Sequence, residues 1–249
     1  DEKVEVLKEL GQKESHIVSF RKALLNSPVS SVDSLLEYRD DFLDIGKMAI
    51  SQALIPCENE ENINTVDRTS SWYHYLYGIL EAPFETFGNN SVSFVTYNYD
   101  RPLEQFFFNS IRYKFSKQKE EVARVLKNIP ILHLHGQLGY LDWQADDETR
   151  SYAPTSNADA IKLCAKHIKI IHEKSDYAKF EVFKETYRLL GEATKVIFLG
   201  FGYNPINIKR LNIGSLVRKE IIGTSMGRTQ KEKDRIERLL DNKIVLPGH

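Results

Sequence analysis

The stretch SVSFVTYNYD, residues 91–100, decides the fold of this chain. Its first half holds β-branched and aromatic residues, which predict a short buried strand. The strand ends at the polar residues from Thr96 to Asp100, and an apolar pattern typical of a helix begins at Leu103. The strand therefore delivers an amide, Asn98, and a carboxylate at its C-terminal end. Because ligands of open α/β sheets bind at that end of the strands, we expect a site there.

Two later stretches repeat this pattern. An apolar strand at residues 129–134 ends in His135 and Gly136, and another at residues 195–199 ends in GFGYN, residues 200–204. One polar strand end is ordinary, since loops usually begin there, but three in one chain favour a common pocket. We expect a doubly wound, mostly parallel, Rossmann-like α/β sheet with helices on both faces.

Two histidines lie near the end of the second strand. His133 and His135 share one face if the strand continues, because side chains alternate along a strand. A lone histidine is more often inert, and we interpret His133 as a sheet-face or core residue. His135 lies at the strand exit beside Gly136, whose missing side chain leaves room for a ligand. We therefore favour a functional role for His135.

The motifs at residues 96–100 (TYNYD), 135–136 (HG) and 197–202 (IFLGFG) together resemble the sirtuin-like family. More narrowly, they resemble the bacterial sirtuin-like domains that hydrolyse NAD in antiphage defence. The resemblance implies an NAD glycohydrolase that cleaves the nicotinamide–ribose bond and releases nicotinamide and ADP-ribose. It also implies a homo-oligomer that assembles with a translocase-type ATPase or another defence partner.

The resemblance also assigns roles to single residues. Asn98 would orient the ribose and the attacking water, and His135 would be the general base, a role that suits an imidazole with its unperturbed pKa of about 6.5. Asp100 would hold the motif loop or contact nicotinamide. Tyr97 stands where sirtuins carry glutamine, which leaves the contact to nicotinamide open. The implied NAD contacts are Thr96, Tyr97, Asp100, Gly136, Gly200, Gly202, Asn204, Asn207 and Thr224.

The chain departs from the family pattern in three places. The Gly-Ala-Gly-x-Ser loop, which would place a helix N-terminus against the phosphates, does not occur upstream of the motifs. Either such a loop precedes Asp1 in a longer protein, or the domain binds something other than NAD. Phe201 and Gly202 replace a Gly-Thr-Ser type exit, which leaves backbone contacts to phosphate. Cys57 and Cys164 alone cannot form a four-cysteine module, so we expect no zinc, which disfavours a deacylase.

Apolar spacing predicts how the rest of the chain is organised. We expect residues 1–88 to form a helical region that packs on or covers the site, and residues 89–249 to form the sirtuin-like core, in one folded unit. A polar loop is expected at residues 58–64, and an irregular insertion with a short strand at residues 168–171 is expected between residues 139 and 176. The other expected helices are 103–115, 118–128, 180–193, 204–211 and 229–240, and the other expected strands are 220–223 and 243–246. Asn204 is expected to cap the helix that follows it, and a capping box from Thr229 to Glu232 is expected to begin the last helix.

Composition limits the class of protein. The 249 residues are 41% hydrophobic and 28% charged, enough for one sizeable core. With 34 basic and 35 acidic residues, the net charge of −1 gives no electrostatic reason to expect nucleic-acid binding. Two cysteines without a Cys-x-x-Cys pair indicate a reducing compartment. No apolar run reaches the roughly 20 residues that span a bilayer, and we expect a cytoplasmic protein.

Two functions of other classes stay open. The chain could be a catalytically silent sensor that binds NAD or ADP-ribose and signals through a partner. It could also be an assembly module that uses the apolar stripes of its helical region. Among enzymes, a sirtuin deacylase is the second choice after the glycohydrolase.

Overall fold

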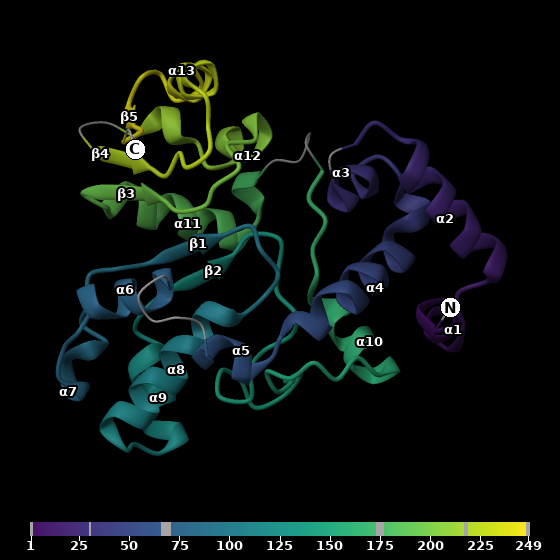
Figure 1. Ribbon diagram of the computed structural model, residues 1–249, viewed down its shortest axis with the longest axis horizontal. Helices are drawn as coiled ribbons and strands as arrows, with labels where there is room; N and C mark the ends of the chain where they lie inside the picture. The colour runs from purple at the N-terminus through teal and green to yellow at the C-terminus, as the bar shows by residue number, and fades with distance from the viewer. Residues whose placement is uncertain (1, 30, 66–70, 173–176, 217–218, 248–249) are drawn as a thin grey trace. The chain divides into compact units, whose positions relative to one another are not determined.

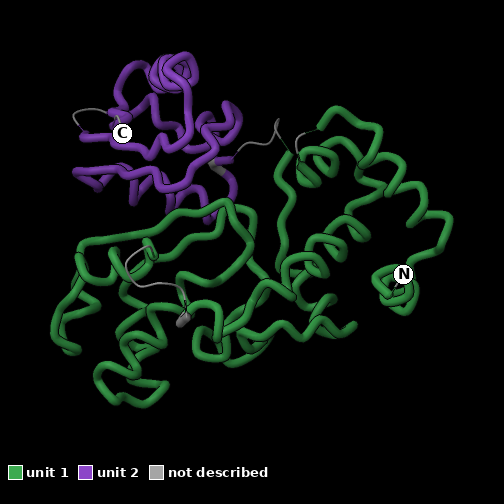
Figure 2. Tube along the Cα trace, viewed as in Figure 1, with its two compact units in different colours: residues 1–172 green, residues 173–249 purple. Residues whose placement is uncertain are grey.

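The structure is a computed structural model that describes residues 2–29, 31–65, 71–172, 177–216 and 219–247 (Figure 1). The chain divides into two compact units, Asp1–His172 and Glu173–His249 (Figure 2), and each unit is described by itself. The boundary expected after residue 88 and the expectation of one folded unit stay predictions.

Most of the described residues between 2 and 65 lie in helices, as the sequence predicts for this region. Gly11, at φ +88°, separates the first two helices, and the Ser31 hydroxyl accepts a hydrogen bond from the Ser34 backbone to begin the third. The prediction of a loop at residues 58–64 is wrong. The Asn59 side chain accepts a hydrogen bond from the Glu61 backbone N–H at 2.9 Å, and a short helix begins there. The elements are α1 (Glu2–Glu9), α2 (Glu14–Asn26), α3 (Val32–Leu36), η1 (Asp40–Phe42), α4 (Leu43–Leu54), η2 (Ile55–Cys57) and α5 (Glu60–Thr65).

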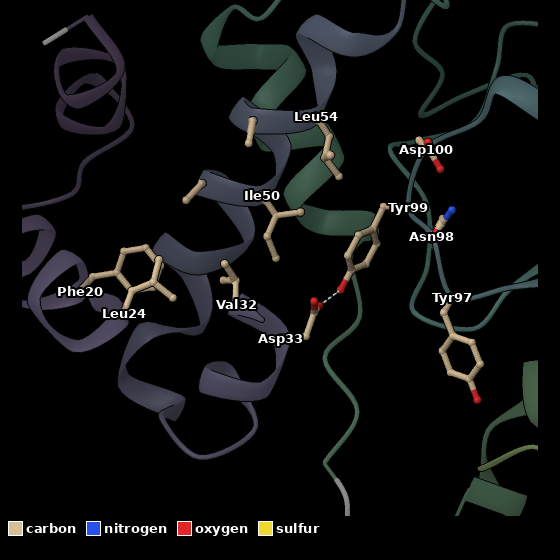
Figure 3. A pocket seen from close by; sticks show the side chains of 12 residues that line it. Phe20, Leu24, Val32, Asp33, Ile50, Leu54, Tyr97, Asn98, Tyr99 and Asp100 are labelled. Atoms are coloured by element: carbon tan, nitrogen blue, oxygen red, sulfur yellow. Dashed lines mark hydrogen bonds between the residues drawn. The ribbon is translucent and has the colours of Figure 1, made fainter. Parts of the chain in front are cut away.

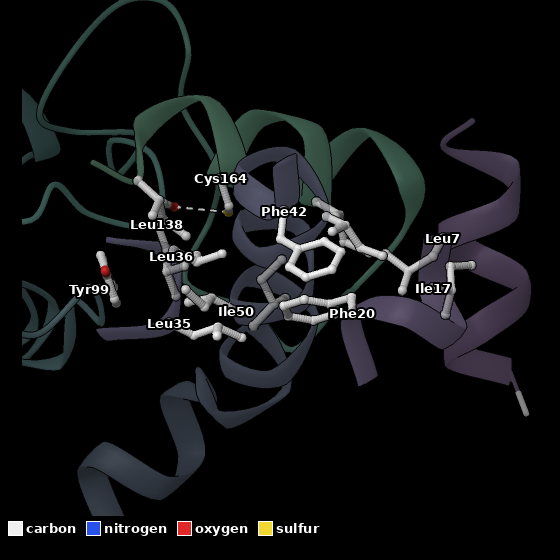
Figure 4. Packing of buried hydrophobic residues seen from close by; sticks show 14 residues of the cluster. Leu7, Ile17, Phe20, Leu35, Leu36, Phe42, Ile50, Tyr99, Leu138 and Cys164 are labelled. Atoms are coloured by element: carbon white, nitrogen blue, oxygen red, sulfur yellow. Dashed lines mark hydrogen bonds between the residues drawn. The ribbon is translucent and has the colours of Figure 1, made fainter. Parts of the chain in front are cut away.

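The helical region packs against a helix from much later in the chain. Figure 4 shows α10 (Ala158–His167) beside the N-terminal helices, with Cys164 in the same apolar cluster as Leu36 and Phe42. Irregular structure was predicted for this segment, but residues 158–167 form a helix that the Asn157 side chain caps. The strand expected at residues 168–171 does not form. That segment is irregular, although Ile168 is fully buried.

The remaining elements of unit 1 build a small parallel sheet and its covering helices. They are α6 (Trp72–Ile79), α7 (Phe84–Phe87), β1 (Phe94–Thr96), α8 (Pro102–Phe115), α9 (Lys119–Leu126) and β2 (Ile131–His133). β1 and β2 pair in parallel, with Phe94 opposite Ile131 and Thr96 opposite His133. The apolar face of α8 packs on this sheet, where the Phe94 and Phe107 rings lie 5.8 Å apart. Parallel pairing brings both strand exits to one edge.

Unit 2 alternates helices and strands around a parallel sheet in the order β3-β4-β5. A capping box between Thr229 and Glu232 begins its last helix, as predicted. The predicted α/β class with parallel strands is confirmed, and the described strands form two sheets, one in each unit. The elements are η3 (Tyr177–Lys179), α11 (Glu181–Glu192), β3 (Lys195–Phe198), α12 (Pro205–Arg210), η4 (Ile213–Ser215), β4 (Glu220–Gly223), α13 (Gln230–Leu239) and β5 (Ile244–Val245).

Within the described parts of the chain, every helix is too short or too polar to cross a membrane.

Candidate functional site

A pocket of about 630 Å³ lies in unit 1 at the exit of β1 (Figure 3). Residues 97–100 line one side of it, and the helices α2, α3 and α4 line the rest with mostly apolar side chains. This volume is typical of small-molecule sites, which combine an apolar lining with a few polar groups. The lining residues from the helices are Phe20, Leu24, Val32, Asp33, Ala49, Ile50, Ala53 and Leu54.

Tyr99 joins the motif to the helical region. Its hydroxyl donates a hydrogen bond to the carboxylate of Asp33 on α3, as Figure 3 shows, and its ring is buried in the apolar cluster of the helices. Its carbonyl oxygen accepts a hydrogen bond from the backbone of Leu138 at 2.9 Å. The pocket wall is therefore tied both to α3 and to the segment after β2.

Asn98 is exposed and lines the pocket, while both ends of its backbone are held. Its N–H donates to the Thr96 hydroxyl at 3.0 Å. Its carbonyl oxygen accepts from Nδ1 of His133 at 2.7 Å. The structure thus presents the Asn98 side chain at the strand exit, the position that the sequence analysis expected.

His133 and Glu104 form a buried pair beneath this motif. Nε2 of His133 lies 2.6 Å from Oε1 of Glu104, which the first turn of α8 supplies. Burial lowers the pKa of His133, but the Glu104 carboxylate and the Asn98 carbonyl raise it by more, so it lies above its usual value. The expectation of a core position for His133 is confirmed by its burial, yet its polar contacts were not foreseen.

Asp100 is half-buried at the edge of the same pocket. Burial raises the pKa of its carboxyl group above the usual range, and the neighbouring His133 opposes this shift. A carboxylate with little water around it interacts strongly with any cation or hydrogen-bond donor that enters. The position therefore suits recognition of a charged or amide-bearing ligand.

His135 is buried at the exit of β2, with 7% of its surface exposed. Its ring meets the Tyr97 ring edge-on, with centroids 5.2 Å apart. Its carbonyl oxygen accepts a hydrogen bond from the Lys169 backbone at 2.8 Å. Among the described residues that line the pocket, Tyr97 is present and His135 is not. His135 thus lies next to the motif and packs against Tyr97, and of these two residues only Tyr97 lines the pocket.

Gly136 adopts φ +75°, and its α-carbon lies against the backbone of another segment. A Cβ atom there would lie 2.0 Å from the carbonyl oxygen of His167, at the end of α10. The space beside Gly136 is therefore filled by protein, whereas the sequence analysis expected room for a ligand. Packing explains the glycine, and its contact with NAD stays a prediction.

Gly136→Ala is expected to lower the free energy of unfolding by more than Gly139→Ala does. Both glycines have nearly the same φ, +75° and +74°, so both variants carry the strain of a positive φ, about 1–3 kcal/mol. Only at Gly136 does the new Cβ also collide with backbone, since at Gly139 its nearest neighbour would be 3.5 Å away. Urea denaturation of both variants measures the difference, and equal losses would contradict the close packing of residue 167 on Gly136.

A buried ion pair anchors the end of the motif. Arg101, which follows Asp100, is 0% exposed and donates from Nε to Oε1 of Glu58 at 2.9 Å. Its Nη1 also donates to the carbonyl oxygens of Gly139, Tyr140 and Arg150, at 3.2, 3.2 and 3.0 Å. The Arg150 guanidinium donates to the same Glu58 carboxylate. The Glu58 carboxylate and the guanidinium groups of Arg101 and Arg150 therefore connect the pocket motif to the helical region and to the loop after β2.

The predicted residues of unit 2 lie around the exits of β3 and β4. The Gly200 N–H donates to the Thr224 hydroxyl at 2.9 Å, and a Cβ at Gly200 or Gly202 would meet no atom within 4 Å. The Asn204 side chain caps α12, as predicted, by accepting from Ile206 at 2.8 Å. Asn207 Oδ1 accepts from the Arg210 guanidinium at 3.5 Å. The space beside both glycines is therefore open, and the NAD contacts of these residues stay predictions.

Over the described ranges, no three histidine, cysteine, aspartate or glutamate side chains gather as a metal site would require. Cys57 is exposed, whereas Cys164 is buried and donates to the Leu138 carbonyl at 3.3 Å. The absence of zinc from the protein stays a prediction.

These features define an α/β protein of parallel strands whose polar residues gather at the strand exits. A family model described as the SIR2-like domain matches residues 92–213, which span β1 to α12 and include both motifs and the glycine exit. The chain therefore carries a SIR2-like domain, as its motifs predicted, and such a domain indicates NAD-related activity. Neither a curated protein nor a solved structure matches the chain.

Proposed function

We propose that this protein is an NAD glycohydrolase that cleaves the nicotinamide–ribose bond of NAD and releases nicotinamide and ADP-ribose. The main support is the pocket, because Asn98 and Asp100 line it together with the apolar side chains of α2 and α4. A flat aromatic ring that carries an amide suits such a lining, because the apolar wall packs on the ring while the polar side chains bond the amide.

The reaction depends more on the position of the ribose and the attacking water than on a strong nucleophile. The bound nicotinamide is already cationic, and its departure develops positive charge on the ribose. Water forms the new C–O bond at the ribose carbon, the C–N bond breaks, and its electron pair stays on the nicotinamide nitrogen. In this proposal Asn98 orients the ribose and the water, His135 takes the proton from the water, and Asp100 contacts nicotinamide.

We further propose the biological setting that the sequence resemblance implies. The activity would deplete NAD in the cytoplasm during antiphage defence. The protein would act as a homo-oligomer, together with a translocase-type ATPase or another defence partner. Light scattering on the purified protein measures its oligomeric state, and a monomer would contradict the proposed homo-oligomer.

The burial of His135 favours a second candidate function. Because its ring packs edge-on against Tyr97 and does not line the pocket, the described arrangement suits binding without turnover. In that case the protein is a sensor that binds NAD or ADP-ribose and signals through a partner.

One pair of measurements separates the two functions. The purified protein is incubated with NAD, nicotinamide and ADP-ribose are quantified by chromatography, and binding is measured by calorimetry. A glycohydrolase is expected to release both products in equal amounts over many turnovers. Tight binding of NAD without products would support the sensor, and the absence of both binding and products would refute both proposals.

A further inference from the structure

His133 contacts two hydrogen-bond acceptors in a nearly dry part of unit 1. Its Nδ1 lies 2.7 Å from the carbonyl oxygen of Asn98, and its Nε2 lies 2.6 Å from Oε1 of Glu104. The side chains of His133 and Glu104 are 4% and 2% exposed. A carbonyl oxygen can only accept, so Nδ1 must carry a proton.

The second ring nitrogen faces a carboxylate. The Glu104 carboxyl group and the Asn98 carbonyl raise the pKa of His133, which favours a proton on Nε2 as well, so that His133 is an imidazolium paired with a carboxylate. A buried charge of either kind is costly alone, which explains why the two occur together. Asp100 is the other charged group that influences this ring. The hydrogen bond to the Asn98 carbonyl is therefore a charge-assisted one.

This bond completes the restraint of the Asn98 backbone. The Thr96 hydroxyl holds its N–H, and Thr96 is itself opposite His133 in the parallel ladder of β1 and β2. With both peptide groups held, the direction in which the Asn98 side chain leaves the backbone is set. The side chain itself stays exposed at the pocket.

We propose that Glu104 and His133 form a positioning pair for Asn98, in which the imidazolium holds the Asn98 carbonyl and so fixes the side chain over the pocket. The proposal deepens the NAD glycohydrolase function and rests on it. His133 does not touch the substrate and is not a catalytic residue. Its effect on turnover comes through Asn98, since a displacement of about 1 Å at a reacting group can cost about 10²-fold in rate.

Two variants of His133 test the pair because each keeps one of its two donors. In His133→Asn the side-chain amide nitrogen takes the place of Nδ1 and still reaches the Asn98 carbonyl, but Glu104 loses its partner. In His133→Gln the amide nitrogen takes the place of Nε2 and still reaches Glu104, but the Asn98 carbonyl is released. If the pair positions Asn98, His133→Gln should be the less active of the two variants, and His133→Asn should be the less stable one.

We expect His133→Gln to lose about 10²-fold in kcat per folded molecule with a much smaller change in KM, and His133→Asn to keep a kcat closer to that of the unchanged protein. The melting temperature should fall further in His133→Asn, which leaves the buried Glu104 carboxylate unpaired. A merely structural role would make the less stable Asn variant the less active one. A kcat in His133→Gln equal to or above that of His133→Asn would overturn the proposal.

A measurement that does not depend on turnover separates this inference from the proposed function. In nuclear magnetic resonance spectra of the unchanged protein at neutral pH, both ring nitrogens of His133 should carry protons. The side-chain amide signals of Asn98 should move in His133→Gln and stay near their places in His133→Asn. A singly protonated His133 or unmoved Asn98 signals would refute the pair, whereas absence of nicotinamide release with these signals present would refute only the glycohydrolase.

Discussion

Asn98→Ala and His135→Ala are each expected to lower kcat for nicotinamide release by about 10²–10⁴-fold. In the proposed reaction His135 takes the proton from the attacking water, and removal of a general base typically costs this much. Loss of the Asn98 amide would leave the water and the ribose without orientation, with a comparable cost. Both variants should remain folded, because Asn98 is exposed and the two tyrosine rings that His135 contacts, those of Tyr97 and Tyr99, stay in place in His135→Ala.

Nicotinamide release and thermal unfolding are measured together for both variants. His172→Ala is the control, because His172 belongs to the same unit and its side chain is 45% exposed. The control should keep full turnover. Unchanged turnover in His135→Ala would remove that residue from catalysis, and a loss of activity that parallels a loss of melting temperature would indicate a structural role.

Glu58→Ala is expected to lower the free energy of unfolding of unit 1 by about 3–5 kcal/mol, the usual cost of removing one partner of a buried ion pair. The carboxylate is 1% exposed and serves two guanidinium groups, those of Arg101 and Arg150. Without it, the fully buried Arg101 keeps hydrogen bonds to carbonyl oxygens but has lost its counter-charge.

Chemical denaturation measures this effect, and Glu14→Ala serves as the matched control. It also removes one carboxylate from an ion pair in unit 1, but the Glu14 side chain is 72% exposed beside Lys8. Ion pairs at the surface contribute little, so the control should change stability much less. Similar losses in the two variants would contradict the burial of the Glu58 network.

Local patterns predicted the elements of this fold wherever an apolar stripe was strong. The strand at Phe94, the helix from Pro102 and the capping box at Thr229 all occur as expected. The helix α5 was missed because it is short and polar, and α10 because only Ile161 and Cys164 of its residues are buried, which gives a weak apolar stripe. Their signal is an asparagine that bonds to the backbone at the helix start, Asn59 in one and Asn157 in the other.

The candidate site could be predicted only in part. The motif after β1 was expected at a strand exit, and the structure places its residues on a pocket wall. The opposite wall comes from α2 and α4. Apolar spacing predicts that one face of each helix is buried, but it does not show which segment packs on that face. The partners of buried charged residues are likewise distant in sequence: Glu104 lies 29 residues before His133, and Glu58 lies 43 before Arg101. The polar stretch at residues 58–64 was therefore interpreted as a loop, and its pattern did not show that Glu58 is buried.

The partners of Arg101 also determine when the pocket can form as the chain folds. The guanidinium takes its ligands from residues 43 positions earlier and 38, 39 and 49 positions later. A growing chain cannot complete this set until residue 150 has left the ribosome, which is 50 residues after the end of the motif at residues 96–100. Contacts of such long range carry a large loop-closure cost and slow the folding of the segments that they join. The partners of Arg101 are thus complete only after the helices α2, α3 and α4, which line the pocket, have all been synthesised.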